Sequence, residues 1–174
     1  MYYELTDHFE VAADIERCWQ FFGSAANLPV ITPPWLNFRI AMPTPLPAIR
    51  QDAVLDYTIR WMGVPVKWRT KIIDWSPPRQ FVDLQIRGPY ALWHHQHRFE
   101  PIGSGGGGSA GGAGGMRCFD RVIYRVPLPV IGRVVHAAFV RKQLMEIFRF
   151  RRKVIGEHLG WVRAVQDDVR LNAL

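Results

Sequence analysis

Two neighbouring stretches, residues 90–101 (YALWHHQHRFEP) and 116–127 (MRCFDRVIYRVP), decide the fold of this chain. In an extended strand successive side chains point to opposite faces, so Trp93, His95 and His97 share one face of the first stretch. Imidazoles on an otherwise aromatic face are unusual for a plain core. They predict the wall of a cavity that holds a partly apolar, partly hydrogen-bonding molecule.

The composition is that of one globular domain. The chain has 174 residues, 48% of them hydrophobic, which is enough to build one core. We expect a single domain over residues 1–164 and a frayed tail over 165–174. The start of the chain has no secretory signal pattern, and no apolar run is long enough to cross a bilayer, so we expect a cytoplasmic protein. Cys18 and Cys118 are expected to be buried free thiols.

The charge is strongly positive, with a formal net value of +7. Much of the excess lies between residues 133 and 163, where eight basic residues face two acidic ones: Arg133, Arg141, Lys142, Arg149, Arg151, Arg152, Lys153 and Arg163 against Glu146 and Glu157. A solvated helix face explains this pattern, and weak contact with an anionic membrane is an alternative. No nucleic-acid motif is present, so no nucleic-acid partner is expected.

The first third of the chain predicts one strand, short helices and an irregular segment. Residues 2–11 alternate apolar and polar side chains, as a half-buried strand does. Asp14 is in the position of a helix N-cap for a short helix over 15–22. The proline-rich segment 29–47 is unsuited to a long helix or a central strand, although 35–41 has room for a brief edge strand.

The middle of the chain predicts an antiparallel meander. Alternating patterns separated by turn residues give strands near 52–61, 66–72, 81–86, 90–101 and 116–126. Residues 103–115 contain nine glycines and are expected to form a hairpin loop. They include a G-x-G-x-x-G match that lacks the following helix a dinucleotide site needs, so no cofactor is expected. A long helix with one apolar stripe is predicted from about 130 to 164.

Assembled in order, these elements give an α+β fold in which one curved antiparallel sheet of about seven strands wraps around the C-terminal helix, with two short helices after the first strand. One helix does not fill the whole concave side of such a sheet. The space that remains predicts a hydrophobic pocket.

The sequence resembles the SRPBCC superfamily, the START and birch-pollen-allergen-like helix-grip proteins that include polyketide cyclases and lipid carriers. The resemblance spans nearly the whole chain and is carried by short matches at 9–11, 15–22, 28–29, 32–35, 61–65, 68–69, 88–90, 93–95, 97–99 and 120–122. It is nearest to an uncharacterised bacterial ligand-binding branch. The resemblance implies a helix-grip fold with a deep cavity for a hydrophobic small molecule or lipid.

The hairpin across the glycine run supplies the candidate catalytic residues. If Phe99 pairs with Cys118, then His97 lies opposite Asp120, and Trp93 lies opposite Tyr124. Asp120 would then orient His97 and raise its basicity. With Tyr124 as an acid, this set is suited to a dehydration or an aldol-type cyclisation of a polyketide. A purely structural His and Asp pair explains the same residues.

A metal site is an alternative interpretation of the same strand, because His95 and His97 at i and i+2 can converge on one ion. No third ligand lies nearby in the sequence, apart from Asp120 across the hairpin. The pattern favours hydrogen-bonded cavity lining, so no metal is expected.

The predicted function is binding or carriage of a hydrophobic small molecule or lipid in the internal cavity. The expected ligand-binding residues are bulky or polar side chains on the inward faces: Tyr57, Ile59, Trp61, Trp68, Trp93, His95, His97, Tyr124 and Phe148. The first alternative is a cyclase or dehydratase that uses His97, Asp120 and Tyr124. The second is a peripheral membrane protein that uses the basic C-terminal helix.

Overall fold

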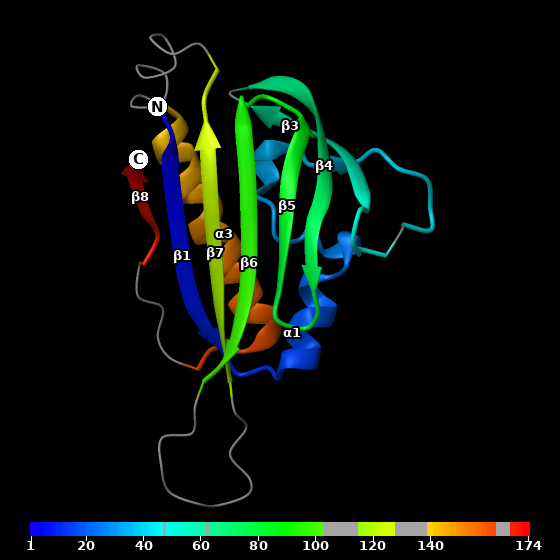
Figure 1. Cartoon of the computed structure of the whole chain (residues 1–174), viewed down its shortest axis with the longest axis vertical. Helices are drawn as coiled ribbons and strands as arrows, with labels where there is room; N and C mark the ends of the chain where they lie inside the picture. Colours follow the sequence, from blue (N-terminus) through cyan, green and yellow to red (C-terminus); the bar gives the residue numbers. More distant parts are fainter. Residues whose placement is uncertain (47, 62, 103–114, 128–138, 163–167) are drawn as a thin grey trace, which may run out of the picture.

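The computed structural model describes the chain except residues 47, 62, 103–114, 128–138 and 163–167. The described part is an α+β structure built on one antiparallel sheet of eight strands, in the order β2-β3-β4-β5-β6-β7-β1-β8. The strands are β1 (Tyr3–Val11), β2 (Arg39–Ile40), β3 (Val54–Trp61), β4 (Val64–Ser76), β5 (Gln80–Arg87), β6 (Leu92–Pro101), β7 (Met116–Arg125) and β8 (Arg170–Ala173). Figure 1 shows the sheet with the long helix behind it.

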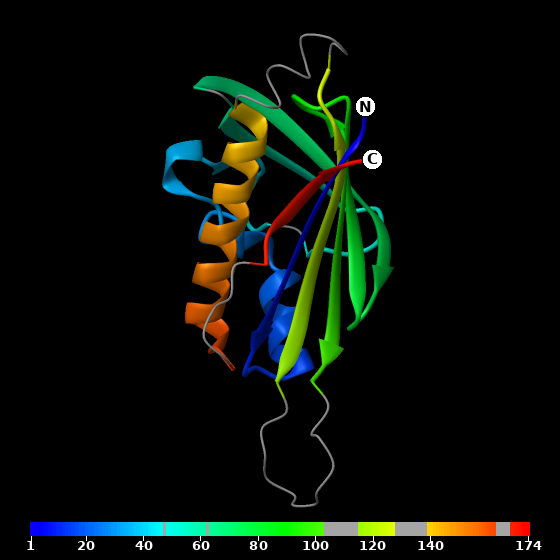
Figure 2. The same cartoon turned by 90° about the vertical axis from the view of Figure 1, so that its left-hand side faces the viewer.

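The helices lie on one side of this sheet. Helix α1 (Ile15–Phe22) and the 3₁₀ turns Ala25–Asn27 and Pro34–Leu36 follow β1, and α3 (Arg141–Leu159) precedes β8. Figure 2 shows α3 running along the concave side of the curved sheet. The predicted helix-grip architecture is therefore confirmed.

The start of α1 is fixed by the predicted cap. The backbone N–H of Arg17 donates to Oδ1 of Asp14 at 2.8 Å, which satisfies one of the donors that every helix leaves open at its first turn. The helix then presents Cys18 and Phe22 to the core. The chain turns at Gly23, whose N–H donates to the carbonyl of Trp19.

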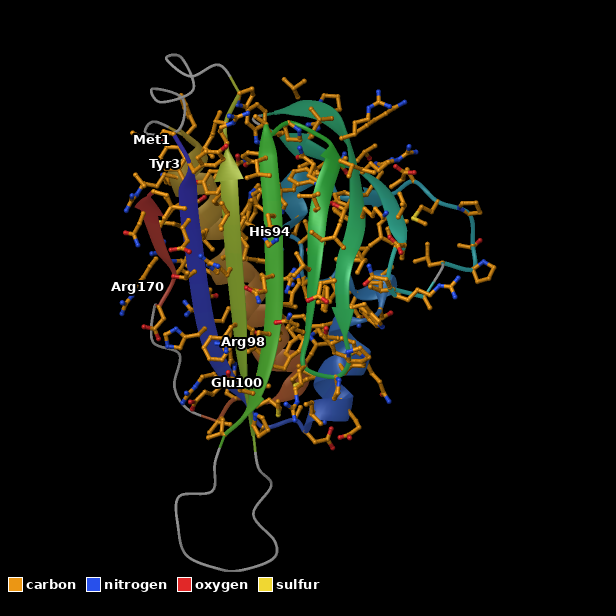
Figure 3. All side chains as sticks on the ribbon, in the orientation of Figure 1. Met1, Tyr3, His94, Arg98, Glu100 and Arg170 are labelled. Atoms are coloured by element: carbon orange, nitrogen blue, oxygen red, sulfur yellow. The ribbon has the colours of Figure 1, made fainter. Side chains whose placement is uncertain are left out.

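The alternation in β6 follows from its position inside the sheet, with one face against the core and one against solvent. Trp93, His95, His97 and Phe99 are buried. Figure 3 shows the labelled His94, Arg98 and Glu100 along the same strand, on the side of the sheet away from α3. The predicted assignment of inward and outward side chains on this strand is therefore confirmed.

The pairing of β6 with β7 has the predicted register. His97 is the partner of Asp120, His95 of Val122, and Trp93 of Tyr124. The hairpin loop expected between them lies outside the described residues, apart from Gly115, whose carbonyl accepts a hydrogen bond from the N–H of Ile102.

Two expectations about the C-terminal part were wrong. Residues 170–173 are not frayed, because β8 pairs antiparallel with β1 and Leu171 is buried opposite Leu5. This strand also brings the sheet to eight strands instead of about seven. The final helix is shorter than predicted at its C-terminal end, since it stops at Leu159 and Gly160 takes a positive φ of 81°. Residues 130–138 and 163–164 of the expected helix lie outside the described part.

Two groups of buried apolar residues lie between the sheet and the helices. One gathers around α1 and includes Phe22, Phe81 and Phe99. The other gathers around Trp93 and Phe148. Both cysteines are buried and free, as predicted.

Candidate functional site

A cavity of about 160 Å³ lies between the concave face of the sheet and α3. Residues of β3 to β6 form one wall, α3 forms the opposite wall, and residues 21–49 contribute the rest. An apolar cavity of roughly 150 Å³ holds a benzene molecule, so this space has the size of one aromatic ring. The pocket predicted between sheet and helix is thus present.

Most predicted ligand-binding residues line this cavity. These are Tyr57, Ile59, Trp61, Trp68, Trp93, His95, His97 and Phe148. Tyr124 does not line it. Its ring is fully buried among Tyr3, Tyr90 and Trp93, with centroid distances of 5.5, 5.7 and 6.0 Å. Tyr124 therefore lies outside the cavity wall, although it shares the inward face of the sheet.

The two histidines stand where the two apolar groups meet. The ring of His97 stacks on Phe81 with centroids 4.3 Å apart, and His95 contacts Phe148 edge-on at 5.6 Å. The two imidazoles are themselves 3.9 Å apart between centroids. Both side chains line the cavity and are almost completely buried.

Asp120 touches both imidazoles from the β7 side. Its Oδ1 lies 2.6 Å from Nδ1 of His97 and 3.2 Å from Nε2 of His95. The contact with His95 is a hydrogen bond, whereas the closer approach to His97 is poorly directed for one. The predicted contact between His97 and Asp120 is present, and it extends to His95.

Asp83 of β5 approaches the other side of the same imidazoles. Its Oδ2 lies 3.3 Å from Nε2 of His97 and 3.4 Å from Nδ1 of His95. Each imidazole therefore has one nitrogen on Asp120 and the other on Asp83. Sequence reasoning missed Asp83, which is the cross-strand partner of His95. It lies two residues after Phe81 on β5, but Phe81 and Val82 are both buried, so alternation alone gave no clear inward side.

Arg151 of α3 completes this polar cluster of Asp83, His95, His97, Asp120 and Arg151. Its Nε lies 3.4 Å from Oδ2 of Asp120, and its side chain is only 12% exposed. The sequence placed this arginine among the solvated basic residues of the final helix, which is wrong. Seven residues after Leu144 and four before Ile155, it falls within the buried stripe.

Electrostatics hold both carboxyls of the cluster in the ionised form. Burial alone raises the pKa of Asp120, but Arg151 and the two histidines outweigh it and hold this pKa well below its usual range. Burial likewise opposes ionisation of Asp83, yet His95, His97 and Arg151 bring its pKa below the ordinary value. The cluster thus contains two carboxylates beside the one guanidinium of Arg151.

The pKa values of the two imidazoles are shifted in opposite directions. Burial and the neighbouring His97 lower the pKa of His95, against the opposing effect of the two carboxylates. Burial also disfavours the charged form of His97, but Asp120 and Asp83 outweigh it and raise this pKa. His97 is therefore the member of the pair that binds a proton more readily.

A second polar group lines the cavity on β3 and β4. The indole N–H of Trp68 donates to the hydroxyl of Thr70 at 3.0 Å, and the hydroxyls of Thr70 and Tyr57 are 3.3 Å apart. Burial, together with the charge of Asp83, raises the pKa of Tyr57, so its phenol stays neutral. These groups give the cavity hydroxyl donors and acceptors in addition to the charged cluster.

Comparison with solved structures identifies the fold. A START superfamily protein from Mycobacterium smegmatis superposes with a TM-score of 0.64 over 90% of this chain and 97% of that one, at 15% sequence identity. The chain has the START-like helix-grip fold. Ginseng major latex-like protein 151 from Panax ginseng has the same START-like fold, with a TM-score of 0.61, 10% identity and coverage of 91% and 98%.

An enzyme with this START-like fold is norcoclaurine synthase from Thalictrum flavum, solved in complex with dopamine and hydroxybenzaldehyde. It matches with a TM-score of 0.59 and 15% identity, over 91% of this chain and 88% of that chain. No family model and no curated protein sequence matches the chain.

The exposure of the basic residues on α3 determines which of them could contact a membrane surface. Arg152 is buried and pairs with Asp7 at 3.0 Å, and the side chain of Arg151 is only 12% exposed. The exposed Lys142 and Lys153 each lie 3.9 Å from a glutamate one turn away. Among the described helices none combines the length and the apolar character that a membrane span requires.

Proposed function

We propose that this protein binds a small, largely apolar molecule, with at least one polar group, in the cavity between the sheet and α3. The observation that carries the proposal is the composition of the cavity wall. Aromatic side chains from β3, β4 and β6 surround the space, and four members of the polar cluster lie in the same wall: Asp83, His95, His97 and Arg151. Ligand pockets combine an apolar lining with a few placed polar groups in this way.

The polar cluster defines how the ligand would be oriented. Its apolar body would pack among Trp61, Trp68 and Trp93, while its polar group would reach His97, Asp83 or the hydroxyl of Tyr57. The complex of norcoclaurine synthase with dopamine and hydroxybenzaldehyde supports the proposal, since each ligand pairs one aromatic ring with polar substituents in the same type of fold.

The experiment is native mass spectrometry after the purified protein is soaked in a mixed lipid and metabolite extract. A retained small molecule is expected in the wild type. The variant Ile147→Trp fills the cavity from α3, and it should lose the retained mass. Ile73→Trp makes the same change at an exposed position of β4 and should keep it. Equal retention in both variants would contradict a ligand held in this cavity.

A catalytic role for the same site is the second candidate. The observation in its favour is an imidazole in the cavity wall, His97, that is in contact with two carboxylates. Such a group is suited to act as a general base in a dehydration or an aldol-type cyclisation. Tyr124 is outside the cavity lining, so the phenols that could serve as acid are those of Tyr57 and Tyr90.

Turnover of a poly-β-ketone analogue tests this candidate. Product formation by the wild type should disappear in His97→Ala and persist in His94→Ala, which alters the neighbouring histidine on the opposite face of β6. Turnover that survives in His97→Ala would remove His97 from the mechanism, and no turnover by the wild type would leave ligand binding as the function.

A further inference from the structure

We propose that Asp83, His95 and His97 form a binding site for a divalent transition-metal ion in the wall of the cavity. One carboxylate oxygen and one nitrogen of each imidazole lie within 4.8 Å of one another. The three side chains come from adjacent strands, β5 and β6, so the sheet itself fixes their spacing.

The separations match the edges of a metal coordination shell. Oδ2 of Asp83 lies 3.4 Å from Nδ1 of His95 and 3.3 Å from Nε2 of His97. Ligands about 2.0–2.1 Å from a tetrahedral ion are roughly 3.4 Å from each other. The two imidazole nitrogens lie within 4.8 Å of each other, so an ion could bind all three atoms after the imidazoles adjust.

Asp120 occupies the place of the outer carboxylate that supports histidine ligands. A histidine that binds a metal with one nitrogen usually donates its other N–H to a carboxylate or carbonyl, which fixes the ring and its tautomer. Here Asp120 lies against Nε2 of His95 and Nδ1 of His97, the two nitrogens that face away from Asp83. Both imidazoles thus present their remaining nitrogen on the side of Asp83.

The charge of the cluster also favours a cation. Asp83 and Asp120 bring two negative charges, and Arg151 brings one positive charge, so the cluster carries an excess negative charge when both imidazoles are neutral. A buried excess of this kind needs a counter-charge. A divalent ion supplies it, in competition with a proton on an imidazole.

The donor set indicates the class of metal. Two imidazole nitrogens and one carboxylate oxygen suit Zn²⁺, Co²⁺, Ni²⁺ or Fe²⁺, whereas Ca²⁺ and Mg²⁺ prefer oxygen alone. All three ligands line the cavity. A site with three protein ligands keeps a coordination position for water or a bound molecule, which is the arrangement of catalytic metal sites.

The test uses full-length protein without a histidine tag, stripped of metal with a chelator. Addition of Co²⁺ should produce the visible absorption of a low-symmetry Co²⁺ site, saturating at one ion per chain, and Zn²⁺ should displace it. Affinity for Zn²⁺, measured by calorimetry, should fall at least tenfold in Asp83→Asn and in His97→Gln. Asp120→Asn keeps all three ligands and should lower the affinity about 10- to 100-fold.

His94→Gln is the matched control, since it removes a histidine from the outer face of β6 (Figure 3), and its affinity for Zn²⁺ should equal that of the wild type. Wild-type protein that shows no Co²⁺ spectrum and no saturable Zn²⁺ binding overturns the proposal, whatever the variants do. So does an equal loss in His94→Gln and His97→Gln. Retention of a hydrophobic molecule is measured separately, so failure of the metal site leaves the proposed ligand binding standing, and the reverse holds as well.

Discussion

His97 and Asp120 face each other across the β6–β7 pair, with Nδ1 of the imidazole 2.6 Å from Oδ1 of the carboxylate. Both side chains are almost wholly buried. The contact therefore joins two groups that would each be costly to bury alone. Around it, the cluster links the sheet to α3 through Arg151, so the same residues position a site and hold two layers of the fold together.

The first prediction concerns the stability provided by Asp120. In Asp120→Ala, Arg151 and the two imidazoles lose their shared carboxylate inside the protein. Removal of one partner of a buried ion pair typically costs about 3–5 kcal/mol. We expect a loss of this size in the free energy of unfolding, measured by urea denaturation. Glu100→Ala removes a carboxylate from the outer face of β6 and should cost less than about 1 kcal/mol. Similar losses in both variants would contradict a buried role for Asp120.

The second prediction concerns the width of the cavity. Phe148 is buried on α3 and lines the cavity beside His95. Phe148→Ala should lower the free energy of unfolding by about 3–5 kcal/mol, because it removes buried apolar contacts and leaves a void. The enlarged space should also let the protein retain a bulkier molecule than the wild type, as measured by native mass spectrometry. Phe139→Ala, at a 59% exposed position, should change stability by less than about 0.5 kcal/mol. An unchanged ligand size in Phe148→Ala would argue against binding in this cavity.

The third prediction concerns β8. Leu171 is buried opposite Leu5 of β1. Leu171→Ala should therefore cost about 2–5 kcal/mol of stability, whereas Asn172→Ala, on the exposed side of the same strand, should have little effect. Thermal unfolding of the two variants separates them. Equal midpoints would mean that the C-terminal strand does not contribute to the folded state.

The fourth prediction tests the membrane alternative with residues that are exposed. Lys142 and Lys153 have side chains 80% and 72% exposed on α3. If α3 meets an anionic surface, the double variant Lys142→Glu and Lys153→Glu should abolish salt-sensitive cosedimentation with vesicles rich in phosphatidylserine. Lys71→Glu, on β4, changes one exposed lysine elsewhere and should leave binding intact. If the wild type does not cosediment at low salt, the membrane alternative is excluded.

Much of the fold could be predicted from the sequence, since alternation in strands is a local signal. In β6 and β7 it placed His97 and Asp120 on the inward face, because one slipped residue would have turned them to opposite faces. A slip of two residues would have kept both on that face, so the register itself was assumed, and the structure confirms it. Helix α1 was equally legible through its Asp14 cap. The strand at 170–173 was missed because four residues carry little periodicity of their own. Its stability comes from pairing with β1, which lies far away in the sequence.

The site was only half predictable, because charged residues were interpreted by type more than by position. His95, His97 and Asp120 were found from their shared face. Arg151 was missed because arginine on a helix usually faces solvent, although its spacing from Leu144 placed it on the buried stripe. Asp83 belongs to a strand with buried residues on both faces, Phe81 and Val82, so alternation there gave no clear inward side.

The last prediction is a pH dependence of stability that arises from Asp7. This residue is buried on β1, pairs with Arg152 at 3.0 Å and lies opposite Asp120 in the sheet. Burial raises its pKa to about 7. Arg152 opposes this rise, whereas Asp120 and Asp168 add to it. The folded protein therefore keeps a proton on Asp7 that the unfolded chain releases near pH 4. The stabilisation linked to this proton is fully present below about pH 4 and is lost as the pH rises through about 7.

Asp7→Asn mimics the protonated acid and removes this dependence. Relative to the wild type, its free energy of unfolding should rise between about pH 4 and pH 8. Because one pKa unit corresponds to about 1.4 kcal/mol, the change should not exceed roughly 4 kcal/mol. Urea denaturation across this pH range measures it. Asp52→Asn alters an exposed carboxylate on the loop before β3. Its free energy of unfolding should change with pH in the same way as that of the wild type. If the free energy of unfolding of Asp7→Asn also follows the pH dependence of the wild type, Asp7 is already ionised in the folded protein at pH 4. Its ion pair with Arg152 then outweighs the effect of burial.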